Sequence, residues 1–182
     1  MLSKVYAAAA LMVACLGITV RGYAADVNLY VGGGPELNGE QSNMALGVDL
    51  NGPAWPMPIP YHFFSFGSGL TYLSTDVDEH SESWVFSVYP QIRVDVPMMV
   101  GRWQPFVVAQ FLGPSYLSSR QLGSREQGAH FTFRDMIGAG FHSADRSMRV
   151  YLSWRHFSNG YLASPNDGFN VPVGLNFEYA LP

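Results

Sequence analysis

Charge is scarce in this sequence. Charged residues make up 13% of its 182 residues, whereas about 25% is usual for a soluble domain. The 10 Lys and Arg residues form no cluster and the net charge is −4, so nucleic acid is not an expected partner. The chain is long enough for one domain and hardly for two. That domain has less charge than a surface in contact with water usually carries.

Cysteine is almost absent, and the single Cys15 lies in an N-terminal segment typical of a secretory signal. Lys4 supplies a positive charge, residues 5–20 are almost wholly apolar, and small residues precede a predicted cleavage after Ala24. An N-terminal membrane helix is a competing interpretation, but this apolar core is shorter than the roughly 20 residues that a spanning helix needs. A lipoprotein site at Cys15 would leave further apolar residues before the domain. The predicted mature domain, 25–182, contains no cysteine and cannot form a disulfide.

Long apolar runs are absent after residue 24, so the mature chain offers no candidate transmembrane helix. Backbone groups in lipid have no water to bond, and only helices or edge-free sheets satisfy them there. If the mature domain enters a membrane, it must therefore do so as a closed β-barrel. Aromatic residues reach 14% and glycines number 19, a composition typical of strands and turns.

Apolar and polar residues alternate along most of the mature chain. In 83–96, Trp84, Phe86 and Val88 share one parity, and in the last segment the odd-numbered residues from Val171 onward form the apolar set. Successive side chains of a strand point to opposite faces, so each segment has one apolar and one polar face. The pattern predicts eight strands, at 26–33, 44–51, 60–74, 83–96, 104–116, 129–142, 148–158 and 171–181.

Eight alternating strands predict an all-β fold, an eight-stranded antiparallel transmembrane β-barrel of the outer-membrane type. The alternative is a soluble sandwich or lipocalin-like barrel with an apolar interior. The polar face has few Lys or Glu residues, which suits a filled lumen, and aromatic residues gather near strand ends as in an interfacial girdle. Extracellular loops are expected at 76–82, 118–128 and 161–168, and periplasmic turns at 51–60, 97–104 and 144–146.

His156 and Ser158 are the candidate site residues. They lie two apart in a predicted strand and share the apolar parity of Leu152 and Trp154, so in a membrane barrel both would face lipid. A histidine beside a serine hydroxyl can accept the hydroxyl proton, provided that a third group orients the ring. The spacing alone favours a simpler interpretation, in which the strand is ending and both residues touch head groups and water.

Other polar residues suggest no further chemistry. Arg134 and Asp135 are predicted to belong to a polar network in the lumen. The remaining histidines show no ligand spacing, and no glycine-rich phosphate loop opens a helix. We therefore expect neither a metal site nor a cofactor.

Several short runs occur in a characteristic order. They are Ala25-Asp26-Val27, Pro105-Phe106, an FxDxIGAG pattern at 133–140, then His156, Ser158 and Asn159, and Pro165-Asn166-Asp167-Gly168. Together they resemble the PagL family of outer-membrane lipid A 3-O-deacylases. The resemblance is strong over about the last 80 residues and loose before them.

The resemblance implies an eight-stranded barrel whose active site lies on the outer wall, at the level of the outer leaflet. Ser158 would be the nucleophile and His156 the general base, with Asn159 and the Gly160 backbone N–H forming an oxyanion hole. The implied activity is that of a serine esterase that removes the ester-linked hydroxyacyl chain at the 3-position of lipid A. The implied partners are lipid A or lipopolysaccharide as substrate and outer-membrane lipids. A homodimer is one assembly that this interpretation allows.

One position departs from the family pattern. In the family pattern, the acid that orients the histidine lies fourteen residues after it. This chain has Asn170 at that position. An asparagine can accept a hydrogen bond from the imidazole but cannot stabilise an imidazolium by charge. Three hypotheses follow: Asn170 acts as a weaker third member, a shifted loop brings Asp167 into that role, or the protein is a catalytically weak or inactive barrel that braces the membrane or binds a partner.

Overall fold

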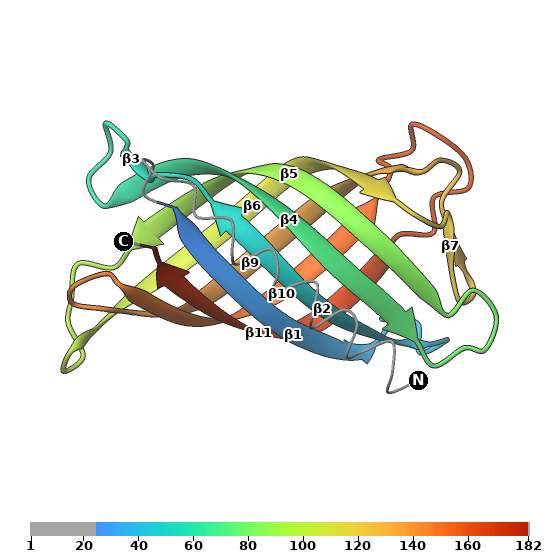
Figure 1. Ribbon diagram of the computed structural model, residues 1–182, viewed down its shortest axis with the longest axis horizontal. Helices are drawn as coiled ribbons and strands as arrows, with labels where there is room; N and C mark the ends of the chain where they lie inside the picture. Colours follow the sequence, from blue (N-terminus) through green and yellow to red (C-terminus); the bar gives the residue numbers. More distant parts are fainter. Residues whose placement is uncertain (1–24, 182) are drawn as a thin grey trace.

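The chain folds as a closed antiparallel β-barrel. The computed structural model describes residues 25–181, and the predicted signal segment 1–24 lies outside the described residues. The first long strand, β1, pairs with both β2 and the last strand, β11, which closes the barrel (Figure 1). The eight long strands of the described chain are β1 (Asp26–Pro35), β2 (Ser42–Asn51), β4 (His62–Thr75), β5 (Glu82–Asp95), β6 (Trp103–Leu117), β9 (Phe131–Ser143), β10 (Met148–Ser158) and β11 (Phe169–Ala180).

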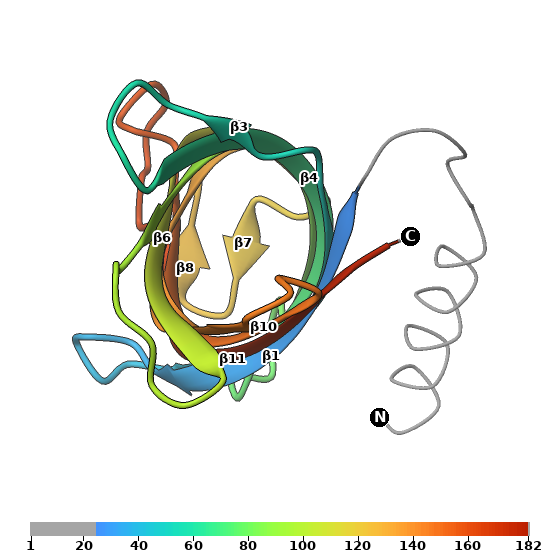
Figure 2. The ribbon, with the colours of Figure 1, turned by 90° about the vertical axis from the view of Figure 1, so that its left-hand side faces the viewer.

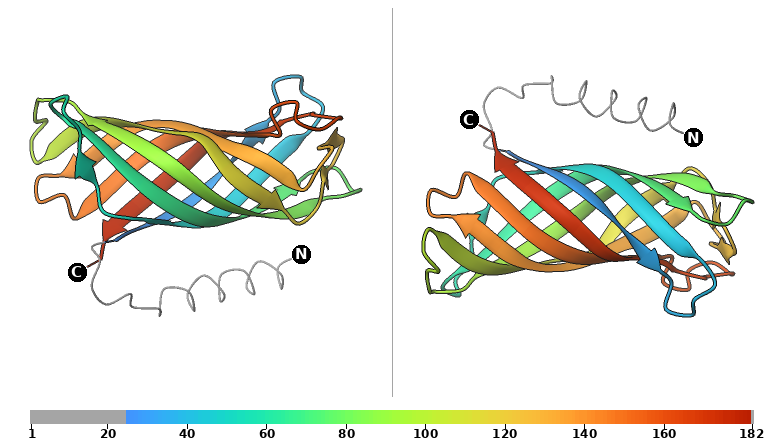
Figure 3. Two further views of the ribbon diagram at one scale, coloured as in Figure 1. Left: turned by 90° about the horizontal axis from the view of Figure 1, so that it is seen from above. Right: turned by 90° about the horizontal axis from the view of Figure 1, so that it is seen from below.

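Three further strands are two residues long. The strand β3 (Trp55–Pro56) pairs with β4, while β7 (Gln121–Leu122) and β8 (Arg125–Glu126) form a hairpin within the connection from β6 to β9. Seen along the barrel, this hairpin lies within the outline of the barrel wall, at the far end (Figure 2). The connections 36–41, 76–81, 118–130 and 159–168 share this end, and β11 finishes at the opposite end (Figure 3). No helix in the described part of the chain is long and apolar enough to cross a membrane.

The eight predicted strands are confirmed, each to within two residues of its predicted ends. The hairpin β7–β8 was not predicted, because strands of two residues are too short to show alternation. It occupies a segment that the sequence marks only as a polar loop.

The two faces of the barrel wall differ as the alternation predicts. Along β10, Arg149, Tyr151 and Arg155 are buried inside the barrel, whereas Leu152 is 58% exposed on the outside. The same contrast holds on the other long strands, whose outward residues include Ile137 and Leu175. We call this outward, apolar surface the outer wall.

Charged side chains in the lumen are paired. The guanidinium of Arg134 donates two hydrogen bonds of 2.8 Å to the two carboxylate oxygens of Asp49, and both side chains are fully buried. Arg155 donates to Asn176 at 2.6 Å and stacks over the Tyr30 ring at 3.5 Å. Buried charges are costly unless they are paired and hydrogen-bonded, so this network ties opposite sides of the barrel together.

The prediction that Arg134 and Asp135 share a lumen network is confirmed for Arg134 and wrong for Asp135. Neighbouring residues of a strand face opposite sides, so only one of the two can face the lumen. Asp135 lies on the outer wall opposite His156 in the β9–β10 ladder, and its carboxylate accepts a hydrogen bond from the Leu112 backbone N–H at 2.7 Å.

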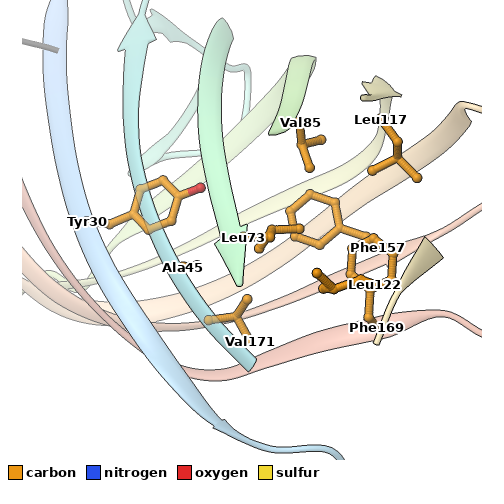
Figure 4. Packing of buried hydrophobic residues seen from close by; sticks show 9 residues of the cluster. All are labelled: Tyr30, Ala45, Leu73, Val85, Leu117, Leu122, Phe157, Phe169 and Val171. Atoms are coloured by element: carbon orange, nitrogen blue, oxygen red, sulfur yellow. The ribbon is translucent and has the colours of Figure 1, made fainter. Parts of the chain in front are cut away.

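An apolar cluster fills the lumen near the end that carries the β7–β8 hairpin (Figure 4). The rings of Phe157 and Phe169 stack with their centroids 5.5 Å apart, and Leu122 of the hairpin belongs to the same cluster. The lumen is therefore packed beneath the last residues of β10, which supports this part of the outer wall from inside.

Replacing Asp49 with alanine should strongly destabilise the barrel. The change leaves the buried Arg134 guanidinium without its carboxylate, which costs about 3–5 kcal/mol in comparable buried pairs. Urea unfolding of the purified barrel in detergent, followed by tryptophan fluorescence, measures the loss. Asp78→Asn, in an exposed loop, is the control and should leave the unfolding midpoint unchanged. Equal midpoints for wild type and Asp49→Ala would show that the pair contributes nothing.

Candidate active site on the outer wall

His156 and Ser158 lie on the outer wall at the end of β10. Both are half-buried, while Arg155 and Phe157 on either side of His156 are fully buried in the lumen. Two residues along a strand span about 6.6 Å between Cα atoms, so the imidazole and the hydroxyl are neighbours on one face of the wall. The structure thus brings the two predicted residues together on the apolar side.

A β-bulge in β11 lies beside these residues. Opposite Trp154 of β10, β11 has two residues, Pro172 and Val173, where a regular ladder has one. Because a one-residue slip moves every following side chain to the other face, the parity of β11 reverses at the bulge. Proline has no backbone N–H for the ladder, which suits it to such a position. The prediction that Val171 continues the apolar outer set is therefore wrong, since Val171 is buried in the lumen cluster.

The bulge brings Asn170 to the same side as His156. Without it, Asn170 would share the parity of Asn176 and Glu178, which are buried in the lumen. In the structure Asn170 pairs with His156 across the β10–β11 ladder, and its side-chain Oδ1 lies 2.9 Å from the imidazole Nδ1. Of the two predicted third members, Asn170 is the one in contact with the imidazole. The Asp167 carboxylate instead accepts a hydrogen bond from the Glu126 backbone N–H at 3.2 Å.

Two neighbours restrict the position of the imidazole: Trp154 packs on its face, and Gly168 lies close to its Cε1–Nε2 edge. The Trp154 ring stacks on it, with centroids 5.6 Å apart and planes 5° from parallel. On another side, a Cβ placed on Gly168 would lie 2.7 Å from His156 Cε1 and 3.1 Å from Nε2. Only glycine leaves room for the ring in this position. Sequence analysis assigned Gly168 to a turn and did not connect it with the imidazole.

The loop 159–168 is held by Asn159. The Asn159 side chain is fully buried and donates to the carbonyl oxygens of Ala163 at 2.8 Å and Pro165 at 3.1 Å, and its backbone N–H donates to Asn166 Oδ1 at 2.8 Å. Gly160 follows with φ 63°, a conformation that favours glycine. No hydrogen bond of the described residues uses the Gly160 backbone N–H.

Asn170 in turn contacts a carboxylate that sequence analysis missed. Glu36, in the loop after β1, is buried and accepts hydrogen bonds of 2.7 Å from both the backbone and the side-chain N–H groups of Asn170. The two residues are 134 positions apart in the chain, and they meet because β1 and β11 close the barrel. No short-range motif marks such a contact.

A shallow groove of about 320 Å³ runs along the outer wall next to Trp154. Its lining includes Ile137, Leu152 and Val173, and its floor includes Gly138 and Ala139 of the FxDxIGAG pattern. Trp154, which stacks on the imidazole, also lines the groove, so this apolar surface is separated from His156 by one ring.

Comparison with known proteins identifies a family and a curated relative. A family model described as "Lipid A 3-O-deacylase (PagL)" matches residues 46–180. Lipid A deacylase PagL of Bordetella bronchiseptica (strain ATCC BAA-588 / NCTC 13252 / RB50) is 33% identical over 87 residues, which are 46% of this chain and 47% of that protein. The chain thus spans about half the length of the curated relative that it matches.

Two of the solved structures that this chain resembles illustrate the barrel fold. One is a crystal structure of the outer membrane enzyme PagL, with a TM-score of 0.64 and 23% sequence identity. The match covers 86% of this chain and 99% of the chain in that structure. A crystal structure of Neisserial surface protein A has a TM-score of 0.53 at 10% identity, with 86% of this chain and 95% of its own covered. At these identities the likeness concerns the fold alone.

Gly168→Ala should displace the imidazole without unfolding the barrel. The added Cβ meets the tip of the ring, which can turn away, and a misplacement of about 1 Å can lower a rate about 10²-fold. The measurement is the rate at which a fluorophosphonate probe labels Ser158, read by intact mass. Gly52→Ala is the control, because its Cβ would approach only a backbone oxygen, Phe66 O, at 3.2 Å. Labelling of Gly168→Ala at the wild-type rate would contradict this role.

Proposed function

The chain belongs to the lipid A 3-O-deacylase (PagL) family, and on this premise we propose that it is an outer-membrane serine esterase that removes an ester-linked hydroxyacyl chain from the 3-position of lipid A. The observation that carries the proposal is the hydrogen bond from His156 Nδ1 to Asn170 Oδ1, on an apolar wall and two residues from Ser158. It supplies the oriented base that a serine nucleophile needs.

The proposed location is the outer membrane, reached by export with removal of residues 1–24. Outward residues such as Leu152, Ile137 and Val173 are each 58% exposed, which supports contact of the outer wall with acyl chains. A barrel has no unpaired sheet edge, so its backbone is satisfied in lipid. The loops 76–81, 118–130 and 159–168 would then face outward, with the site at the level of the outer leaflet. Lipid A would reach this site by lateral diffusion.

In the proposed reaction, His156 Nε2 accepts the proton of Ser158 as the serine Oγ bonds to the ester carbonyl carbon. The bond between this carbon and the lipid A oxygen breaks, and that oxygen takes the proton from His156. The acyl chain remains as an ester on Ser158. A water molecule then adds to this ester, with His156 again accepting a proton. The bond between the acyl carbon and Ser158 Oγ breaks, Oγ takes the proton back from His156, and the hydroxy fatty acid leaves. No cofactor takes part in these steps.

The negative charge that develops on the carbonyl oxygen needs nearby donors. We assign this role to the Gly160 backbone N–H, two residues after the end of β10. Asn159 takes part by holding the loop through its bonds to Ala163 and Pro165. Its own amide could donate to the oxyanion only after releasing one of these carbonyls. The groove beside Trp154 would receive an acyl chain of the substrate.

The decisive experiment is mass spectrometry of lipid A from cells that express the wild-type chain or a variant. Wild type should remove one hydroxyacyl group, and Ser158→Ala and His156→Ala should each abolish this loss, because they remove the nucleophile and the base. Ser164→Ala, an exposed serine in the neighbouring loop, is the matched control and should behave as wild type. Heat-modifiable gel migration verifies insertion of every variant.

Unchanged lipid A in cells with correctly inserted wild type would reject the esterase. It would favour the second candidate, a structural or partner-binding barrel. The observation that favours this candidate is the neutral Asn170 at the position where the family has an acid. Recovery of the protein in the soluble fraction would reject both in favour of a soluble lipid-binding barrel.

A further inference from the structure

We propose that Glu36 is a positioning residue for the reaction, and that it provides, through Asn170, the carboxylate that position 170 itself lacks. This inference rests on the proposed function for its kinetic consequences. Its structural part, the orientation of the His156 imidazole, is tested independently below.

The Glu36 carboxylate is surrounded by hydrogen-bond donors. Its Oε1 accepts from the Asn170 backbone N–H at 2.7 Å and from Asn43 Nδ2 at 2.6 Å, and its Oε2 accepts from Asn170 Nδ2 at 2.7 Å. The residue is 3% exposed, and no ion pair of residues 25–181 includes it. A buried carboxylate without a cation is costly unless N–H groups satisfy it. Three short bonds from two residues meet this requirement.

These bonds decide which way the Asn170 amide points. Only the NH₂ group of an amide can face a carboxylate, so Nδ2 turns toward Glu36 and Oδ1 turns toward His156. Without the carboxylate, either orientation would suit the imidazole equally, because a neutral imidazole can donate or accept at Nδ1. Glu36 removes this ambiguity.

The amide orientation in turn decides the tautomer of His156. Because Asn170 Oδ1 only accepts, the imidazole proton must be on Nδ1, and Nε2 keeps its lone pair. This is the form that can take a proton from Ser158. The opposite orientation would present Nδ2 to Nδ1, move the ring proton to Nε2 and block the base. In serine proteases, where an aspartate makes this contact, its replacement by asparagine costs about 10⁴-fold through the wrong tautomer.

The carboxylate is held on its far side as well. Asn43 Oδ1 accepts from Gln41 Nε2 at 2.7 Å, and Gln41 Oε1 accepts from the Ser124 backbone N–H at 2.9 Å and the Ser124 hydroxyl at 3.0 Å. Ser124 lies in the turn between β7 and β8. Consecutive hydrogen bonds of this kind polarise one another. This series of hydrogen bonds connects the β7–β8 hairpin at the barrel end with the imidazole.

The test relocates the negative charge without changing side-chain shape. It compares wild type, Glu36→Gln, Asn170→Asp and the double variant Glu36→Gln/Asn170→Asp, with lipid A in mixed micelles as substrate. In the double variant, the new carboxylate at position 170 accepts from His156 and from the new amide NH₂ group at position 36. The amide oxygen at position 36 accepts from the remaining two donors. Every hydrogen bond of the wild type then has a counterpart, with the charge one residue closer to the imidazole.

We expect Glu36→Gln to lower kcat about 10²- to 10⁴-fold with little change in KM, because the Asn170 amide is free to turn. Asn170→Asp alone should also lower kcat, since two carboxylates cannot both stay ionised at hydrogen-bond distance. The double variant should recover to within about tenfold of wild type, a coupling expected only for residues that act together. Glu40→Gln, in the same loop but exposed, is the control and should match wild type.

The second readout does not depend on activity. Nitrogen-15 NMR of histidine-labelled protein, recorded at about pH 9, above the usual titration range of histidine, identifies the tautomer, and His156→Gln assigns the signal. Wild type and the double variant should have the proton on Nδ1, and Glu36→Gln should shift it toward Nε2. An unchanged Nδ1–H tautomer in Glu36→Gln would overturn the inference. It would also be overturned if the double variant lost as much kcat as the two single variants combined. If wild type fails to deacylate lipid A, the proposed function is wrong, and the tautomer still decides whether Glu36 orients the ring.

Discussion

The closed hydrogen-bonded ladder is the constraint on which the rest of this structure depends. Each long strand is paired on both sides, so its side chains must alternate between lumen and outer wall. This alternation puts the Asp49–Arg134 pair inside and the apolar residues outside. It also puts a histidine and a serine on the wall, where polar groups are costly unless they have a purpose. A bulge in β11 then reverses the parity of that strand, and this local exception brings Asn170 to the histidine.

Much of this architecture could be predicted from the sequence, because period-two alternation is a local signal that long strands show clearly. The eight strands, the closed all-β fold and the outward parity of His156 and Ser158 follow from it. The prediction failed where a local rule was broken or too short to show. The parity of Val171 was wrong because two residues, Pro172 and Val173, stand opposite one, and Asp135 was wrong because its neighbour Arg134 already takes the lumen side.

The contacts around the imidazole could be predicted only in part. Asn170 was identified by its spacing from His156, which the family pattern supplies. Glu36 could not be, because its contact with Asn170 depends on the closure of β1 against β11, over 134 positions. The general lesson is physical: a missing charge at one position of a site can be supplied by a residue that is adjacent only in the closed barrel. The neutral asparagine then conveys orientation rather than charge.

The most direct measurement is a crystal structure of the purified barrel after reaction with a fluorophosphonate. We predict a phosphonyl group on Ser158 Oγ at the outer wall, with His156 Nδ1 bonded to Asn170 Oδ1 and Asn170 Nδ2 bonded to the Glu36 carboxylate. An adduct on another residue, or Asn170 turned into the lumen away from His156, would contradict both the proposed site and the parity change in β11 that creates it.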